Sequence, residues 1–325
     1  MIVSIPEEFL SIANEFKECF TEPQVRHFCR YVWGLIIGEG GRNIQDIAAA
    51  YLEATDQSSL NNFICDSTWS RDKVRDKRIE LVNRAIGRHV RRDKPLLFVL
   101  DDIVITKSGR CMQGAGYFYS NTERRTVWAH NFVSSFLVAD HLRMTVEALE
   151  KKAAAASGYR GVKVVNYPCY ATRPLEVYIP DVSPAQVVFS KARISSEQKR
   201  VSLEEIEPKA TATSSLTWSK TKILTLYAKR SLIENGYRDE KQNLGLGQYQ
   251  VRKTNSILRH AELVFCAHPL LVLMNLRRKR GQRFRTLGQM CQWAKQLQMR
   301  EAIAWAYKKW SKGESLNDVL DILSL

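Results

Sequence analysis

The spacing of hydrophobic and polar residues divides the chain into a helical first part and a mixed remainder. Up to about residue 92, apolar residues recur at helical spacing between short polar breaks, in the runs FLSIANEFKECF, VRHFCRYVWGLI, NIQDIAAAYLE, SLNNFICDSTW and DKVRDKRIELVNRAIGRHV. The pattern therefore predicts an all-helical region over 1–92. The break at 55–58 separates two of these helices with the spacing of a helix-turn-helix, which reads DNA in some proteins and is purely structural in others.

The pattern changes after Lys94. PLLFVLDD is a short continuous apolar run that ends in Asp101 and Asp102, which predicts a buried strand with carboxylates at its end. GAGYFYSN and RTVWAHNFVSSFLVA predict a hairpin. A helix is predicted at about 141–157, followed by a short strand, VKVV, that ends at Asn166. This order of three strands, a helix and a strand is the opening of a ribonuclease-H-like α/β sheet.

A polar stripe is predicted on one later helix. Tyr227, Arg230, Glu234 and Lys241 follow the pattern Y-x2-R-x3-E-x6-K, and at 100° per residue they fall within about 60° of one another. A solvated, salt-bridged helix face is the simpler interpretation. A protein that only binds a polyanion needs no acid within a basic stripe, so the stripe favours chemistry at a phosphate.

The charge balance points to a polyanionic partner. The chain has 325 residues, a formal net charge of +15 and 45% hydrophobic residues, so it is not wholly disordered. Basic residues cluster at 87–94 and 277–285. Nucleic acid is the favoured partner. A membrane surface is the rival, but no uninterrupted apolar span of about 18 residues is found, so a soluble protein without a membrane partner is expected. A third alternative is an RNA-binding or structural protein that is basic by composition alone.

Cysteine and histidine give no sign of a soft metal site. The seven cysteines and six histidines are widely scattered, with no C-x2-C pair. We therefore expect any metal to be held by oxygen.

With these motifs in place, the chain resembles a DDE transposase of the insertion-sequence group that carries the tyrosine-arginine-glutamate-lysine signature. LDDIVITKSG resembles the first-acid strand of that group, with Ile103 where threonine is common, and the signature helix with the following GLGQYQVRK resembles the third-acid helix. The resemblance implies a retroviral-integrase-like core, two divalent ions (Mg²⁺ or Mn²⁺), and cleavage and strand transfer at transposon ends.

The expected fold is α/β, with a ribonuclease-H-like (retroviral-integrase-like) core, a β-rich insertion and an N-terminal all-helical DNA-binding domain. The expected segments are a helical DNA-binding domain at 1–92, the first part of the core at 93–174, the insertion at 175–220, the acid-bearing helix and end of the core at 221–270, and a basic helical C-terminal region at 271–325.

The resemblance assigns Asp101 and Glu234 as catalytic residues and metal ligands. Carboxylate oxygens suit Mg²⁺, and phosphodiester attack by two ions places them roughly 3.5–4 Å apart. Asp102 is the alternative to Asp101, and because adjacent side chains of a strand point to opposite faces, only one of the two is expected to be a primary ligand.

The same resemblance implies contacts with double-stranded DNA, at transposon ends and at the target. Arg230 and Lys241 are expected to hold phosphates and Tyr227 to position the DNA. Further DNA contacts are expected from Arg238, Arg277, Arg278, Lys279 and Arg280. A homodimer on DNA and a cytoplasmic, nucleoid-associated location are also expected.

One position departs from the family pattern. Asn166 stands where the second catalytic aspartate is expected, and its neutral oxygen lowers the negative charge available to two dications. Metal binding and rate should both fall. Asp140 and Asp181 are possible substitutes. Either the asparagine is a substitution that traps a complex, or the chain is a transposase-derived DNA-binding protein that has lost its chemistry.

Overall fold

The computed structural model describes most of the chain. The described residues are 1–38, 40–52, 56–90, 96–120, 122–139, 142–149, 169–171, 173–179, 183–192, 209–213, 215–228 and 231–323. They form two compact units, one of Met1–Arg160 with Ile233–Leu325 and one of Gly161–Leu232. The sequence-based boundaries at 92/93 and 270/271 both fall inside the first unit.

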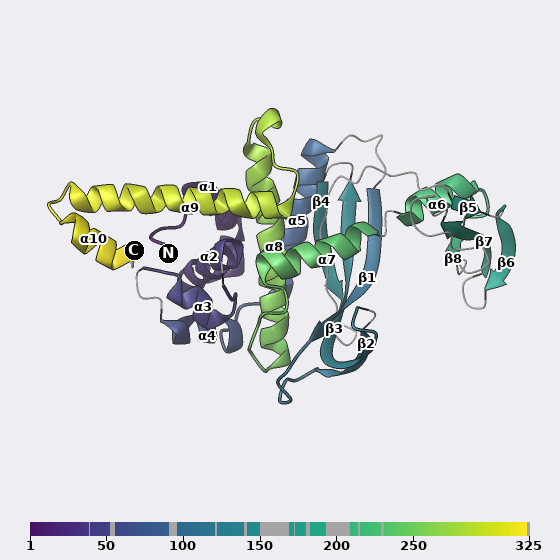
Figure 1. Cartoon of the computed structure of the whole chain (residues 1–325), viewed down its shortest axis with the longest axis horizontal. Helices are drawn as coiled ribbons and strands as arrows, with labels where there is room; N and C mark the ends of the chain where they lie inside the picture. The colour runs from purple at the N-terminus through teal and green to yellow at the C-terminus, as the bar shows by residue number, and fades with distance from the viewer. Residues whose placement is uncertain are drawn as a thin grey trace, which may run out of the picture. The chain divides into compact units, whose positions relative to one another are not determined.

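The helical body of the first unit is built around α8 (Thr254–Arg277). Most residues of this helix are buried, and helices from both ends of the chain pack on it (Figure 1). These are α1 (Glu7–Ala13), α2 (Glu22–Ile37), α4 (Gln57–Cys65), α5 (Arg71–His89) and α9 (Leu287–Trp310). By length and composition α8 could cross a membrane, but 89% of its most apolar window is buried inside the protein. Its apolar character is therefore accounted for by packing in a protein core.

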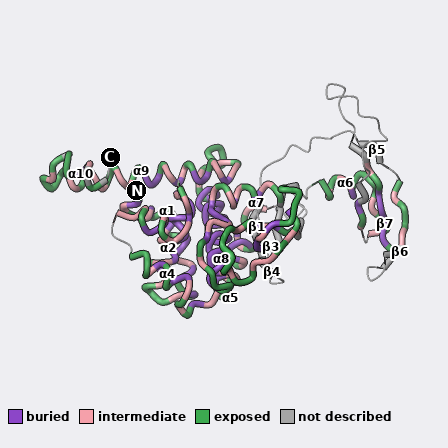
Figure 2. The backbone as a smooth tube through the Cα atoms, turned by 60° about the horizontal axis from the view of Figure 1, so that its bottom comes forward, coloured by how far each residue is buried: buried purple, intermediate pink, exposed green. Residues whose placement is uncertain are grey.

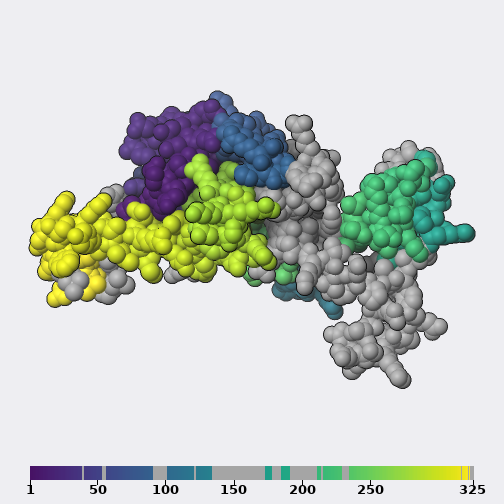
Figure 3. Space-filling model, turned by 90° about the horizontal axis from the view of Figure 1, so that it is seen from above, coloured from purple at the N-terminus to yellow at the C-terminus, as the bar shows by residue number. Residues whose placement is uncertain are grey.

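Smaller elements complete this body. They are η1 (Asn14–Cys19), α3 (Ile44–Ala49), η2 (Arg280–Gln282) and α10 (Leu316–Leu323). The C-terminal part of α9 extends from the body together with α10 (Figure 3). Many residues along this part of α9 and along α10 are exposed (Figure 2).

The sheet of the first unit is antiparallel throughout. Its strands are β1 (Leu96–Thr106), β2 (Gly116–Ser120), β3 (Arg125–Ala139) and β4 (Leu142–Leu149). β3 pairs with each of the other three strands. The order is β1-β3-β2, and β4 pairs with β3 outside this path. The predicted strand and the predicted hairpin are confirmed. β1, however, continues to Thr106, so the two aspartates lie inside the strand and not at its end.

The helix predicted at about 141–157 is wrong over Leu142–Leu149, which form β4. The run LRMTVEAL is rich in residues with high helix propensity, and these favoured the helical interpretation. It also places apolar residues at every second position, which is the period of a strand. Pairing with β3 uses that alternation, so tertiary context overrides local propensity here.

The second unit contains a separate antiparallel sheet and one helix. Its elements are β5 (Cys169–Ala171), β6 (Leu175–Ile179), β7 (Ser183–Ala192), β8 (Lys209–Thr213) and α6 (Lys220–Ala228). β7 is central and pairs with the other three strands. Three of these strands lie in the segment 175–220, which the sequence predicts to be β-rich.

The described members of the polar stripe lie in two helical segments. Tyr227 belongs to α6, in the second unit, whereas Glu234 and Lys241 belong to the part of α7 (Ser231–Leu244) that falls in the first unit. Residues 229–230, between the two segments, lie outside the described residues, so the single continuous stripe stays a prediction.

Candidate active site

Two side chains of α7 are bonded to the backbone of β1. The Tyr237 hydroxyl donates to the carbonyl oxygen of Asp101 at 2.8 Å, and the Lys241 ammonium donates to that of Val104 at 3.1 Å. The two contacts place α7 against β1, and Figure 1 shows the helix lying across the strands of the sheet. Both acceptors are main-chain atoms, so these bonds fix the helix against the strand itself.

Glu234 lies on the side of α7 that faces β1. It precedes Tyr237 by three residues and Lys241 by seven, and residues at these spacings share one side of a helix. Glu234 is thus one turn earlier, about 4.5 Å along the helix axis from Tyr237. Its side chain is exposed, while Tyr237 is buried. The carboxylate also stands in the first turn of α7, where the helix dipole favours a negative charge.

The two aspartates of β1 occupy opposite faces of the sheet. Ile103 and Ile105 are both buried, so the alternation of the strand places Asp101 on their face. Gly247, in the loop after α7, packs directly on Ile105, which identifies this face as the one that α7 and its loop cover. Asp101 therefore lies on the same face as α7.

Asp102 is engaged on the other face. Its Oδ2 accepts a hydrogen bond of 3.0 Å from the Nδ2 of Asn131 on β3. Asp102 points away from the side that carries Glu234. Of the two aspartates, only Asp101 is on the correct face to act with Glu234.

The loop after α7 fixes the far end of the helix. The Lys107 ammonium donates to the carbonyl oxygens of Gly247 and Tyr249 and lies 3.5 Å from the centre of the Tyr249 ring. Burial lowers the pKa of Lys107 to about 8. Gly247 has φ +97°, and a Cβ there would lie 2.7 Å from Ile105, so glycine is required at this close approach.

Two buried histidines support the same loop in their neutral form. Tyr249 donates to Nδ1 of His130 at 2.7 Å, so the other nitrogen, Nε2, carries the proton donated to the carbonyl of Gln113. On α8, His260 accepts at Nδ1 from the Tyr31 hydroxyl at 2.9 Å. Burial lowers the pKa of both histidines, that of His260 to about 4. These are structural contacts that join β3, α2 and α8 around the loop.

α7 also carries a fully buried acid. Glu240 is 0% exposed and its Oε1 accepts from Nδ1 of His268 on α8 at 2.9 Å. A second buried pair, Arg78 on α5 with Glu262 on α8 at 2.7 Å, lies in the same core. α7 is thus held on one side by β1 and on another by the helical body.

Lys241 and Arg278, both predicted to contact DNA, are engaged within the protein. Lys241 is half-buried, and burial lowers its pKa. Arg278 places its guanidinium 4.7 Å from the ring centres of both Phe284 and Trp293. Their contacts make these two residues anchors of α7 and of the segment after α8.

The other predicted DNA contacts are more accessible. Arg277 donates to the Ser11 hydroxyl at 2.6 Å but remains exposed. The remaining described members of the predicted set are all exposed, namely Tyr227, Arg238, Lys279 and Arg280. Tyr227 lies in the second unit, whereas Glu234 lies in the first.

Asn166, Arg230, Asp140 and Asp181 lie outside the described residues. Among the residues that are described, no group of three or more histidine, cysteine, aspartate or glutamate side chains could hold a metal ion. Asp101 and Glu234 still offer two carboxylates from adjacent elements, and such hard oxygen donors fit Mg²⁺ or Mn²⁺. The donor set fits the ion type, and its third member is expected at position 166.

Sequence reasoning did not single out Tyr237 or Lys107. The available signal for Tyr237 was its position three residues after Glu234, on the same side of the predicted helix. Lys107 gave no such signal, because its partners are carbonyl oxygens 140 or more residues away.

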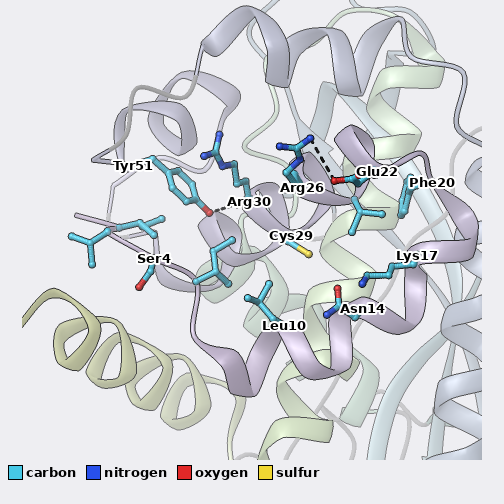
Figure 4. Close-up of a pocket in the computed structure, with 14 residues that line it drawn as sticks. Ser4, Leu10, Asn14, Lys17, Phe20, Glu22, Arg26, Cys29, Arg30 and Tyr51 are labelled. Atoms are coloured by element: carbon cyan, nitrogen blue, oxygen red, sulfur yellow. Dashed lines mark hydrogen bonds and ion pairs between the residues drawn. The ribbon is translucent and has the colours of Figure 1, made fainter. Parts of the chain in front are cut away.

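A cavity of about 730 Å³ lies elsewhere, in the N-terminal part of the first unit (Figure 4). It is bordered by the first residues of the chain, α1, η1 and α2, and its lining comes entirely from residues 2–51. Lys17, Arg26 and Arg30 contribute the cations among its lining residues. The cavity is separate in sequence from the α7–β1 junction.

The comparison with protein families agrees with the geometry at β1. The family model described as DDE superfamily endonuclease matches residues 15–152, which include Asp101 and all four strands of the first sheet. The match supports a DDE-type, transposase-like family. It also supports an α/β, nuclease- or transposase-type enzyme, from a superfamily whose nucleases usually use divalent metals. Glu234 lies beyond the matched segment of the DDE-type model. No curated protein matches the chain.

Proposed function

We propose that this DDE-type chain is a DNA transposase that cleaves and joins DNA at transposon ends with the help of Mg²⁺ or Mn²⁺. The observation that carries the proposal is the hydrogen bond from Tyr237 to the carbonyl of Asp101, one turn from Glu234. It brings the side of α7 that carries Glu234 to the strand that carries Asp101. A ribonuclease-H-like core and the tyrosine-arginine-glutamate-lysine insertion-sequence group are the finer assignments we propose with it.

Each residue has a distinct role in this proposal. Asp101 and Glu234 hold the divalent ions through carboxylate oxygens, and the bound ions supply activation of a water or 3′ hydroxyl and stabilisation of the leaving oxygen. Tyr237 and Lys241 are positioning residues, because each donates a hydrogen bond to a main-chain carbonyl of β1. The exposure of Glu234 leaves the end of the junction open to a DNA phosphate.

Asn166 sets the expected level of activity. An asparagine oxygen carries no charge, so a site built from Asp101, Asn166 and Glu234 holds two dications less well than one with three acids. This observation favours a second candidate function, a transposase-derived protein that binds DNA without cutting it. In either case we propose double-stranded DNA as the partner, a homodimer on that DNA, and a cytoplasmic, nucleoid-associated location.

The decisive experiment compares four proteins on DNA that carries the candidate transposon end. They are the chain as it stands, Asn166→Asp, and each of these with Glu234→Ala. We expect Asn166→Asp to nick the end in Mg²⁺ or Mn²⁺ at least about 100-fold faster than the unchanged chain, by analogy with losses of 10–100-fold for metal-site partners. Glu234→Ala should remove that activity.

Two outcomes would redirect the proposal. If Asn166→Asp binds the end but stays inert, the DNA-binding function replaces the enzymatic one. If the unchanged chain cleaves efficiently and loses this with Glu234→Ala, the second acid lies elsewhere, and Asp140 and Asp181 become the residues to substitute.

A further inference from the structure

The β2–β3 hairpin exposes a group of aromatic rings. Tyr117 and Tyr119 are 75% and 60% exposed, although both lie within a paired strand. Tyr117 stands opposite Trp128, and their rings meet edge to face with centres 5.3 Å apart. The Trp128 indole donates to the carbonyl of Gly109 at 2.9 Å, which fixes its orientation. Cross-strand packing explains the position of the Trp128 ring. It does not explain why two tyrosines on the neighbouring strand leave most of their surface exposed to water.

Two exposed arginines stand close in the chain to these rings. Arg110 follows the glycine whose carbonyl holds Trp128, and Arg124 lies in the turn before β3. Arg125 is also exposed, but it stands opposite Ser120, so strand alternation places it on the other face of the hairpin, and it pairs with Glu123 at 2.6 Å. Exposed rings with arginines nearby in the chain suit a polyanion with aromatic groups.

The rings lie on the same sheet face as Asp101. In the register of the sheet, Ile103 is opposite Phe132 and Ile105 is opposite His130, and residues opposite one another share a face. Trp128 is two residues from His130 and therefore continues this face, as does its partner Tyr117. The face thus runs from Asp101, under α7 and its loop, to the hairpin, which lies clear of α7 (Figure 1).

The rings are well separated from Asp101 along this face. The residue opposite Asp101 on β3 is Ser134, six residues from Trp128, which at about 3.3 Å per residue is about 20 Å along the strand. Ile105 and His130, between these positions, are buried against the loop after α7, so a DNA strand that contacts both ends passes outside that loop.

We propose that Tyr117 and Tyr119 form a stacking platform for unpaired nucleotides of the DNA strand processed at Asp101 and Glu234. The inference rests on the proposed function, since the strand in question is the one that the two acids process. Aromatic side chains stack on unpaired bases of any sequence, and nearby arginines bind the backbone. Duplex DNA keeps its base faces stacked inside the helix, so it gains little from exposed rings.

The test measures DNA binding without cleavage. Anisotropy of a labelled twelve-nucleotide oligothymidine and of a duplex of equal length is recorded with EDTA present, for the unchanged chain and for the double variant Tyr117→Ala/Tyr119→Ala. We expect affinity for the single strand to fall on the order of tenfold or more and affinity for the duplex to stay within about twofold. The variant Tyr117→Phe/Tyr119→Phe, which keeps both rings, should bind the single strand as the unchanged chain does.

Tyr307→Ala is the matched control, because Tyr307 is 65% exposed on α9, away from the sheet. Equal losses for single strand and duplex, no loss for either, or the same loss with Tyr307→Ala would overturn the platform. Near-ultraviolet circular dichroism identifies a misfolded double variant, and the single variant Tyr119→Ala then decides the outcome. The binding test does not depend on cleavage, so a failure of the platform is distinguishable from a failure of the proposed function.

Discussion

The two glutamates of α7, six residues apart, are in opposite environments. Glu240 is fully buried and bonded to His268, whereas Glu234 is exposed in the first turn. A buried carboxylate bonded to a histidine of α8 holds the helix in the core, whereas the carboxylate of Glu234 stands at the surface beside β1. The comparison shows that position relative to β1 and α8, more than residue type, separates structural from candidate catalytic groups along this helix.

The largest expected effect is the difference in the free energy of unfolding between the Glu240→Ala and Glu234→Ala variants. Glu240→Ala leaves the His268 side chain buried without its partner, and the free energy of unfolding should fall by about 3 kcal/mol or more. Glu234→Ala, the same substitution on the same helix, should change it by no more than about 0.5 kcal/mol. Urea unfolding of the two variants measures both. Similar losses in the two would remove the distinction between the acids.

A pH-dependent effect of intermediate size is expected at Lys107. Its folded pKa of about 8 is below the ordinary value of 10.5, so between these values the unfolded chain binds more protons and stability rises with pH. The free energy of unfolding of the unchanged chain, minus that of Lys107→Met, should therefore increase by about 2 kcal/mol between pH 8 and pH 10.5. Denaturant titrations at several pH values provide the comparison. A flat or falling difference would mean that Lys107 is not buried against the loop after α7.

The smallest effect on stability is expected at the α7–β1 junction. Tyr237→Phe removes one hydrogen bond to the Asp101 carbonyl, at a cost of about 1 kcal/mol. If that bond positions Glu234, the same change in the Asn166→Asp background should also slow nicking and weaken Mn²⁺ binding. Arg238→Ala, an exposed change one residue later on α7, serves as the control for stability. Loss of stability with unaltered nicking would restrict Tyr237 to a purely structural role.

The sequence predicted the local elements best where one period dominated. The apolar run before Asp101 and the β2–β3 hairpin were both identifiable from spacing alone. The segment Leu142–Leu149 failed because helix-forming residues there follow a period of two. The stripe from Tyr227 to Lys241 stays a prediction as one helix, because residues 229–230 lie outside the described residues.

The candidate site was predictable as a set of residue types but not as a geometry. Alternation showed that Asp101 and Asp102 diverge, but only the burial of Ile103 and Ile105 shows which face meets α7. Lys241 is a predicted phosphate ligand, and the structure adds its bond to the Val104 carbonyl, which the motif could not predict. Such contacts join residues more than 130 positions apart, and spacing within a single helix carries no information about them.

The central claim is that Asp101 and Glu234 hold the same metal ions. Fe²⁺ bound in place of Mg²⁺ generates hydroxyl radicals with ascorbate and peroxide, and these cut the polypeptide close to the metal. We predict two cuts, one near residue 101 and one near residue 234, and excess Mg²⁺ should suppress both. Asp101→Asn and Glu234→Gln should each abolish both cuts. Asp102→Asn should retain both. Cutting at one position only, or cutting that is lost with Asp102→Asn but not with Asp101→Asn, would contradict the account.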